Sequence, residues 1–157
     1  MTLNWKRATP GDLEALTVSR VMVLRAANQL DDHADLSAVE AASRQYYARA
    51  LDDDTHAAWL VYSGDKLVGT GGVSFFQVMP TVHNPTGRKA YIMNMYTAPE
   101  YRRQGIARRT LEMIVAECRR RGVMHISLEA TSAGRPLYAA FGFVNMKDEM
   151  ILPEGHP

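Results

Sequence analysis

The chain has 157 residues, of which 46% are hydrophobic and 22% charged, and its formal net charge is +1. This length suits a single domain, expected over residues 1–157, and the small net charge argues against a field that attracts nucleic acid or an anionic membrane. The one cysteine excludes an intramolecular disulfide, and no apolar run approaches the roughly 20 residues of a membrane span. We therefore expect a cytoplasmic protein without a signal peptide, and neither a nucleic-acid nor a membrane partner.

A strand and a helix are predicted at the N-terminus. Residues 3–8 alternate apolar and polar side chains, as in a short strand. Thr9 is a candidate N-cap, and Pro10 suits the first position of a helix over residues 10–28.

A second helix is predicted over residues 37–51. It starts at Ser-Ala-Val-Glu, residues 37–40, which has the pattern of a capping box. The loop between the two helices, residues 31–35, is acidic. An acidic loop would suit a cationic ligand, although solvated loops are also commonly acidic.

Three strands follow, over residues 57–62, 66–76 and 90–97. The first two are joined by Ser-Gly-Asp, which predicts a tight hairpin. The middle strand carries three glycines at positions 69, 71 and 72, where we expect a β-bulge or a close backbone neighbour. The third strand is apolar on both faces, as in the centre of a sheet.

The C-terminal half predicts two helices and two strands. Apolar residues at helical spacing define a helix from Ile106 to about Gly122. A strand over residues 125–130, a short helix within residues 131–143 and a last strand over residues 143–152 follow. The order β-α-α-β-β-β-α-β-α-β predicts an α/β fold, with a mixed central sheet and helices on both faces.

Four arginines surround one glycine in Glu-Tyr-Arg-Arg-Gln-Gly-Ile-Ala-Arg-Arg-Thr, residues 100–110. The first backbone N–H groups of a helix have no intrahelical acceptor, and the helix dipole adds partial positive charge there. Gly105 and Ala107 leave these amides open, so the segment is a candidate diphosphate site. The alternative is an ordinary solvated helix start.

Three stretches together resemble the GNAT superfamily of acetyl-coenzyme A-dependent N-acetyltransferases. Arg-Arg-Gln-Gly-Ile-Ala, residues 102–107, is similar to the family's R/Q-x-x-G-x-G/A segment. Residues 91–102 resemble the strand and loop that precede it, and residues 135–143 resemble the family's tyrosine-containing C-terminal stretch. The strand over residues 90–97 lacks the glutamate that many members use as a general base.

The resemblance implies acetyl-coenzyme A as co-substrate. Its pyrophosphate would lie on the amides of residues 103–108, and its pantetheine arm would run along the end of the strand over residues 90–97. The coenzyme-binding residues implied are Met95, Tyr96, Thr97, Arg102, Arg103, Gln104, Gly105, Ile106, Ala107 and Arg108.

Two catalytic residues are implied. Tyr138 matches the family tyrosine that assists departure of the thiolate, since a phenol stays protonated at neutral pH and can donate to sulfur. Glu129, at the end of its strand, is the candidate base, and the alternative is a surface carboxylate. The five histidines have no metal-ligand spacing, so no metal is expected.

The resemblance implies an N-acetyltransferase acting by direct attack of a primary amine on the thioester. The acceptor, a small molecule or a peptide amine, stays open. The alternative is a module that senses acetyl-coenzyme A without turnover. Pairing through a sheet edge, common in the family, implies a possible homodimer. Arginines 119–121 end a helix, where cations complement the dipole, and this explains them better than nucleic-acid binding does.

Overall fold

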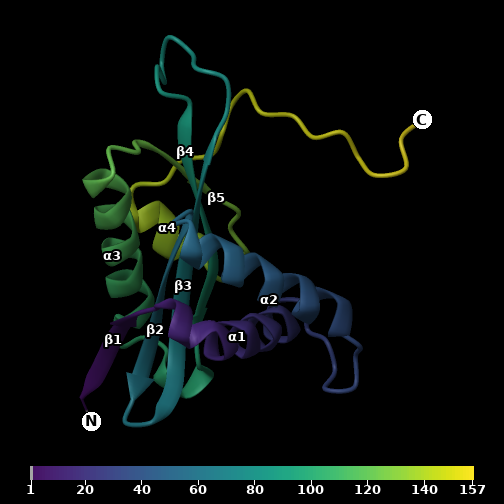
Figure 1. Ribbon diagram of the computed structural model, residues 1–157, viewed down its shortest axis with the longest axis vertical. Coiled ribbons are helices and arrows are strands. Elements are labelled where there is room, and N and C mark those ends of the chain that lie inside the picture. The colour runs from purple at the N-terminus through teal and green to yellow at the C-terminus, as the bar shows by residue number, and fades with distance from the viewer. Residues whose placement is uncertain (1) are drawn as a thin grey trace.

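The computed structural model describes residues 2–157 as one five-stranded sheet with helices packed on its two faces (Figure 1). The elements are β1 (Leu3–Arg7), η1 (Pro10–Asp12), α1 (Leu13–Ala27), α2 (Ser37–Asp52), β2 (His56–Ser63), β3 (Lys66–Gln77), β4 (Arg88–Thr97), η2 (Pro99–Tyr101), α3 (Ile106–Arg120), β5 (His125–Leu128) and α4 (Arg135–Phe141).

The sheet is mixed, as predicted. Its strand order is β1-β2-β3-β4-β5. The first three strand pairs are antiparallel, and β4 pairs with β5 in parallel. Antiparallel neighbours need only short connections, whereas the parallel pair requires the crossover that α3 provides. This crossover places the start of α3 just beyond the C-terminal end of β4.

Alternate side chains of β2 divide the core between the two faces of the sheet. Trp59 packs in a cluster with Leu111 and Ile114 of α3. Leu60 points to the other face and packs with Leu16 of α1 and Tyr47 of α2. Figure 1 accordingly shows α3 on one side of the strands and the pair α1 and α2 on the other. Nearly every residue of β2 is buried, as expected for a strand covered on both faces.

The glycines of β3 allow α3 to approach the sheet closely. A Cβ atom on Gly71 would lie 2.6 Å from Thr110 Cγ2 and 2.8 Å from Met95 Sδ. The close backbone neighbour expected at these glycines is therefore present. A bulge also lies beside Gly71, but its extra residue is on β4: Thr70 pairs with Tyr96 and Gly72 with Met93, so one residue of β3 faces two of β4.

The two predicted helix starts have different outcomes. At η1, the Asp12 carboxylate accepts the backbone N–H of Thr9 at 2.8 Å, so Thr9 caps the first turn as predicted. The capping box predicted at residues 37–40 is wrong, because Ser37 lies inside α2 and Leu36 is the N-cap. The carboxylate of Asp35 accepts the N–H of Ser37 at 2.9 Å, and thereby takes over the stabilising contact.

The last strand predicted over residues 143–152 is also wrong. This segment contains no strand in the structure, and Figure 1 shows it leaving the body of the protein. Its side chains at Val144, Met150 and Ile151 are 89%, 97% and 88% exposed. Alternating apolar residues form a strand only where another strand supplies hydrogen bonds, and this segment pairs with none.

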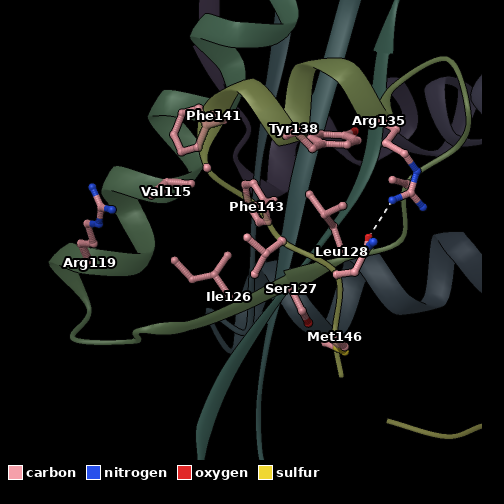
Figure 2. A pocket seen from close by; sticks show the side chains of 15 residues that line it. Val115, Arg119, Ile126, Ser127, Leu128, Arg135, Tyr138, Phe141, Phe143 and Met146 are labelled. Carbon is pink, nitrogen blue, oxygen red and sulfur yellow. Dashed lines mark hydrogen bonds between the residues drawn. The ribbon is translucent and has the colours of Figure 1, made fainter. Parts of the chain in front are cut away.

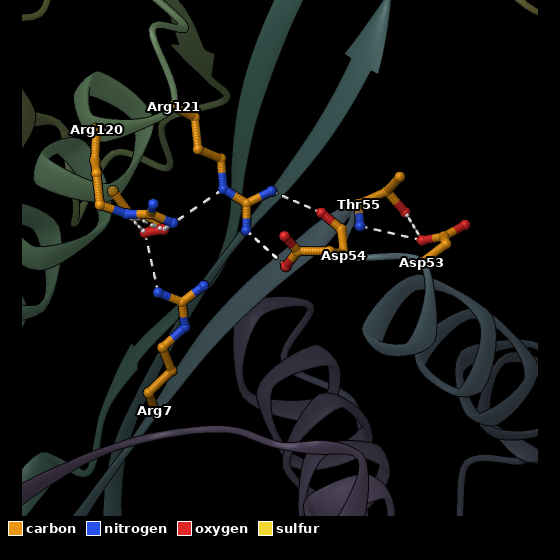
Figure 3. Close-up of polar contacts among 7 residues, drawn as sticks. Arg7, Asp53, Asp54, Thr55, Arg120 and Arg121 are labelled. Atoms are coloured by element: carbon orange, nitrogen blue, oxygen red, sulfur yellow. Dashed lines mark hydrogen bonds and ion pairs between the residues drawn. The ribbon is translucent and has the colours of Figure 1, made fainter.

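Arg120 and Arg121, at the end of α3, belong to an ion-pair network that joins distant elements (Figure 3). Glu117, only 4% exposed in its side chain, pairs with Arg7 of β1 at 2.9 Å and also with Arg120. Arg121 pairs with Asp54 at 2.8 Å, after α2. These contacts join the end of α3 to β1 and to the loop after α2. Arg120 and Arg121 therefore form specific ion pairs, in addition to the favourable interaction of cations with the helix dipole.

Candidate functional site

The start of α3 presents backbone amides that have no acceptor. Gly105 is the N-cap, with φ of 79° in the left-handed region, and it contributes no side-chain cap. Arg103 also has positive φ, at 62°. Along residues 103–108 no amide donates to another group of the described chain, and Arg109 is the first to close a turn, onto Gly105 O at 3.0 Å. Such a turn is a ready anion site.

The predicted side chains lie around this turn with different roles. Arg103 and Gln104 are exposed, and Arg102 donates through Nε to the carbonyl of Thr97 at 3.3 Å. Arg108 pairs with Glu112 at 3.1 Å. The remaining two predicted residues, Ile106 and Ala107, can offer only amides; the Ile106 side chain is 2% exposed and belongs to the core.

The end of β4 has a free edge beside the turn. Pairing with β5 ends at Ile92, so residues 93–97 bond only to β3. Asn94 has φ of 61°, which an asparagine adopts more readily than most residues, and its carbonyl accepts from Thr70 Oγ1 at 2.7 Å. Beyond this bulge lie the predicted residues Met95, Tyr96 and Thr97. The buried Oγ1 of Thr97 has no partner among residues 2–157.

Tyr138 is 9% exposed and packs edge-on against Phe143, with ring centroids 6.0 Å apart. Burial raises the pKa of its phenol, so the hydroxyl is protonated at neutral pH. No side chain or carbonyl in the described part of the chain accepts from this hydroxyl. The predicted donor is therefore neutral and unengaged.

Glu129 lies just past the end of β5 and is exposed. Burial and the neighbouring Glu129 carboxylate together raise the pKa of Tyr91 on β4. This contact puts Glu129 beside the parallel pair where β4 and β5 separate.

A pocket of about 260 Å³ lies on the α1 and α2 face of the sheet, next to the bulge, and was not found from the sequence. Four of its polar residues come from four different elements: Arg20 from α1, Tyr46 from α2, His56 from β2 and Ser74 from β3. Gly72 was the one available signal, because a Cβ there would lie 2.8 Å from His56 Nε2. Nothing in the sequence indicated that these four side chains meet.

A larger cavity, about 860 Å³, lies between α3, β5 and α4 (Figure 2). Tyr138 and Phe143 line it, and Arg135 donates to Asn145 Oδ1 across its rim at 2.8 Å. None of residues 95–108 borders this cavity. Its size alone therefore does not identify it as the active site. The cavity lies along the outer edge of β5, which pairs with no further strand among the described residues.

No three histidine, cysteine, aspartate or glutamate side chains of residues 2–157 cluster as a metal site would require. Over the same residues, none of the helices is both long and apolar enough to span a membrane.

Comparisons with known proteins agree with this geometry. The chain matches the model of the Acetyltransferase (GNAT) family over residues 25–143. It is 31% identical over 90 residues to the uncharacterized N-acetyltransferase YsnE of Bacillus subtilis (strain 168). That match spans 54% of this chain and 54% of the relative, or about half the length of each.

Two solved structures cover nearly the whole chain. The first is a predicted acetyltransferase with acetyl-CoA from Clostridium acetobutylicum, with a TM-score of 0.88, 29% identity, and 97% of this chain and 96% of the other covered. The second is a GCN5-related N-acetyltransferase from Ralstonia eutropha JMP134, with a TM-score of 0.83, 26% identity and coverage of 99% and 100%.

The fold and the comparisons agree on one family. The family match covers well over half of the chain, and the chain belongs to the GNAT acetyltransferase family.

Proposed function

We propose that this protein transfers the acetyl group of acetyl-coenzyme A to a primary amine by direct attack of the amine on the thioester. The observation that carries the proposal is the start of α3, where the backbone amides of residues 103–108 have no acceptor beside the free edge of β4. The Clostridium acetobutylicum relative, similar over nearly the whole chain, was solved with acetyl-CoA.

The residues present fit coenzyme A. Its pyrophosphate would be held by the open amides of residues 103–108, with charge-assisted contacts from Arg102, Arg103 and Arg108. The unpaired Oγ1 of Thr97 and the free backbone groups of residues 95–97 would hold the pantetheine arm. When bound, coenzyme A supplies an acetyl group already activated as a thioester.

The chain's own groups then serve the transfer. A backbone N–H on the free edge of β4 would donate to the acetyl carbonyl oxygen and stabilise the negative charge that develops there. The amine nitrogen would bond to the carbonyl carbon as the carbon–sulfur bond breaks. The Tyr138 hydroxyl would donate a hydrogen bond to the departing thiolate and so stabilise it. Glu129, directly or through water, accepts the proton that the amine loses.

A sensor without turnover is the competing function. It would also use the amides of residues 103–108, but it has no need of an unengaged phenol such as Tyr138. Incubation with acetyl-coenzyme A and a panel of amines, followed by detection of free thiol, separates the two. Amine-dependent thiol release supports the transferase, whereas tight coenzyme binding with no release on any amine supports the sensor.

The amide site has a matched pair of glycine variants. Gly105 and Gly122 flank α3, both have positive φ, and a Cβ on either meets open space. Alanine should therefore cost about 1 kcal/mol of folding stability at each position. Only Gly105→Ala places a methyl group against the open amides, so we expect calorimetry to show coenzyme A binding at least about tenfold weaker in that variant. Equal affinity of the Gly105→Ala and Gly122→Ala variants for coenzyme A would contradict a coenzyme site at these amides.

A homodimer and a cytoplasmic location are further parts of the proposal. The free edge of β5 supports pairing of two copies, and light scattering that finds a monomer at all concentrations would refute it. The free, buried Cys118 is compatible with a reducing compartment, which cell fractionation would check.

A further inference from the structure

The pocket of about 260 Å³ adjoins the proposed acetyl site but is separate from the coenzyme residues. Met93 and Asn94 of β4 form one of its walls, immediately before Met95. The residues that line it are Arg20, Val39, Ala42, Ser43, Tyr46, Tyr47, His56, Ser74, Met93 and Asn94. A molecule seated in this pocket would therefore reach the bulge of β4, next to the free edge proposed to hold the thioester.

Arg20 is the one lining side chain that carries a formal charge at neutral pH, and this charge is not neutralised. Its only hydrogen bond within residues 2–157 runs from Nη1 to Asn94 Oδ1 at 3.3 Å. No carboxylate of the described chain pairs with it, in contrast to Arg7, Arg44 and Arg121. A guanidinium has five N–H donors, so most of those on Arg20 are left for another acceptor.

Three neutral polar side chains of the pocket, Tyr46, His56 and Ser74, are already bonded to one another. Tyr46 Oη lies 2.6 Å from Ser74 Oγ and 2.9 Å from His56 Nδ1. Burial and the charge of Arg20 lower the pKa of His56 to about 4, so the imidazole is neutral at pH 7. The pocket thus offers a single positive charge among neutral aromatic and hydroxyl groups, and no carboxylate that would attract a cation.

We propose that this pocket selects an acceptor bearing a carboxylate, such as a small amino acid, with Arg20 binding the carboxylate while the amine points past Asn94 toward β4. The inference rests on the proposed acetyl transfer. Arg20 can donate two parallel N–H bonds to a carboxylate, the geometry that guanidinium groups favour. The small volume suits an acceptor of amino-acid size, and a polycationic amine would be repelled by Arg20.

The test uses matched ligands that differ only at the acid group: each amino acid of a panel, its amide and its decarboxylated amine. Calorimetry on the full chain saturated with coenzyme A measures their affinity without any turnover. We expect the best amino acid to bind 10- to 100-fold tighter than its amide. Arg20→Gln should abolish this difference, because it weakens the binding of the ligands with a carboxylate and leaves that of the amides unchanged. Arg20→Lys should retain part of the difference.

Arg44→Gln is the matched control, because Arg44 lies on the same helical pair but its charge is compensated by Glu14 and Glu40. It should keep the full preference for the carboxylate. The inference is overturned if amides bind as tightly as amino acids, if Arg20→Gln weakens both equally, or if aminophosphonates bind tenfold tighter than the matching carboxylates. If calorimetry finds no binding of coenzyme A to the unaltered protein, the proposed function itself is contradicted.

Discussion

The buried hydroxyl of Thr97 has no hydrogen-bond partner, and neither does the phenol of Tyr138 within the described chain. Most buried polar groups in folded proteins are satisfied, because an unpaired one costs about 1–3 kcal/mol. Thr97 Oγ1 is such a group, at the end of β4, and its cost would be offset by a ligand that supplies the missing partner.

Tyr138→Phe tests the proposed donor. Its hydroxyl makes no bond inside the protein, so removal should leave the melting temperature and coenzyme A affinity nearly unchanged. We expect kcat to fall about 100-fold, the usual range for a lost general acid. Steady-state kinetics with the best amine of the panel gives the value. An unaltered kcat would assign Tyr138 to the core alone.

At the scale of elements, the bulge in β4 and the glycines of β3 set the site. Gly71 lets α3 pack close to the sheet, and Asn94 turns the strand so that its second half faces the gap. The site therefore depends on backbone conformation at two positions more than on any acidic or basic side chain.

Asn94 offers a test at this scale. Glycine adopts φ near 61° without strain, whereas a β-branched residue does so at a cost of about 1–3 kcal/mol. Asn94→Gly should thus keep the bulge, coenzyme A affinity and most of the activity with small or neutral amines. Asn94→Val should lose both stability and activity. Denaturant unfolding and thiol release measure the two effects, and equal behaviour of both variants would contradict a role for the bulge.

At the scale of the whole molecule, α3 is held to β1 and to the end of α2 by the network around Glu117 (Figure 3). We propose that the chain folds as one domain, since the core and this network link its first and later elements. Calorimetry should then show a single transition with equal calorimetric and van't Hoff enthalpies. Two resolved transitions would contradict it.

Acid should destabilise the fold in two separate pH windows. The Glu117 pKa is lowered from 4.5 to about 2, chiefly by its hydrogen bond from Arg120 and then by that from Arg7. Its stabilising contribution is complete above pH 4.5 and is lost as the pH falls toward 2, because the unfolded chain binds the proton first. The His56 pKa is lowered from 6.5 to about 4 by burial and by the charge of Arg20. The unfolded chain therefore binds a proton at His56 before the folded chain does, and the folded state loses stability as the pH falls from 6.5 to 4.

Two variants separate these windows. Glu117→Gln should reduce the dependence of the unfolding free energy on pH below 4.5, and leave the dependence between pH 4.5 and 6.5 intact. His56→Asn should do the reverse. Urea unfolding at a series of pH values measures both slopes. If either variant kept the slope of the unaltered protein, its residue would not be the titrating group.

Local pattern was enough to predict the helices, five of the six strands and the open amides at the start of α3. Hydrophobic period marks an element's buried face, and the amides of residues 103–108 are neighbours in the chain, so their geometry follows from one helix start. Only the tertiary structure brought Arg20, Tyr46, His56 and Ser74 to one pocket, because four separate elements must pack before those side chains meet. It also decided against the strand at residues 143–152, since a strand exists through its partner and alternating residues alone cannot supply one.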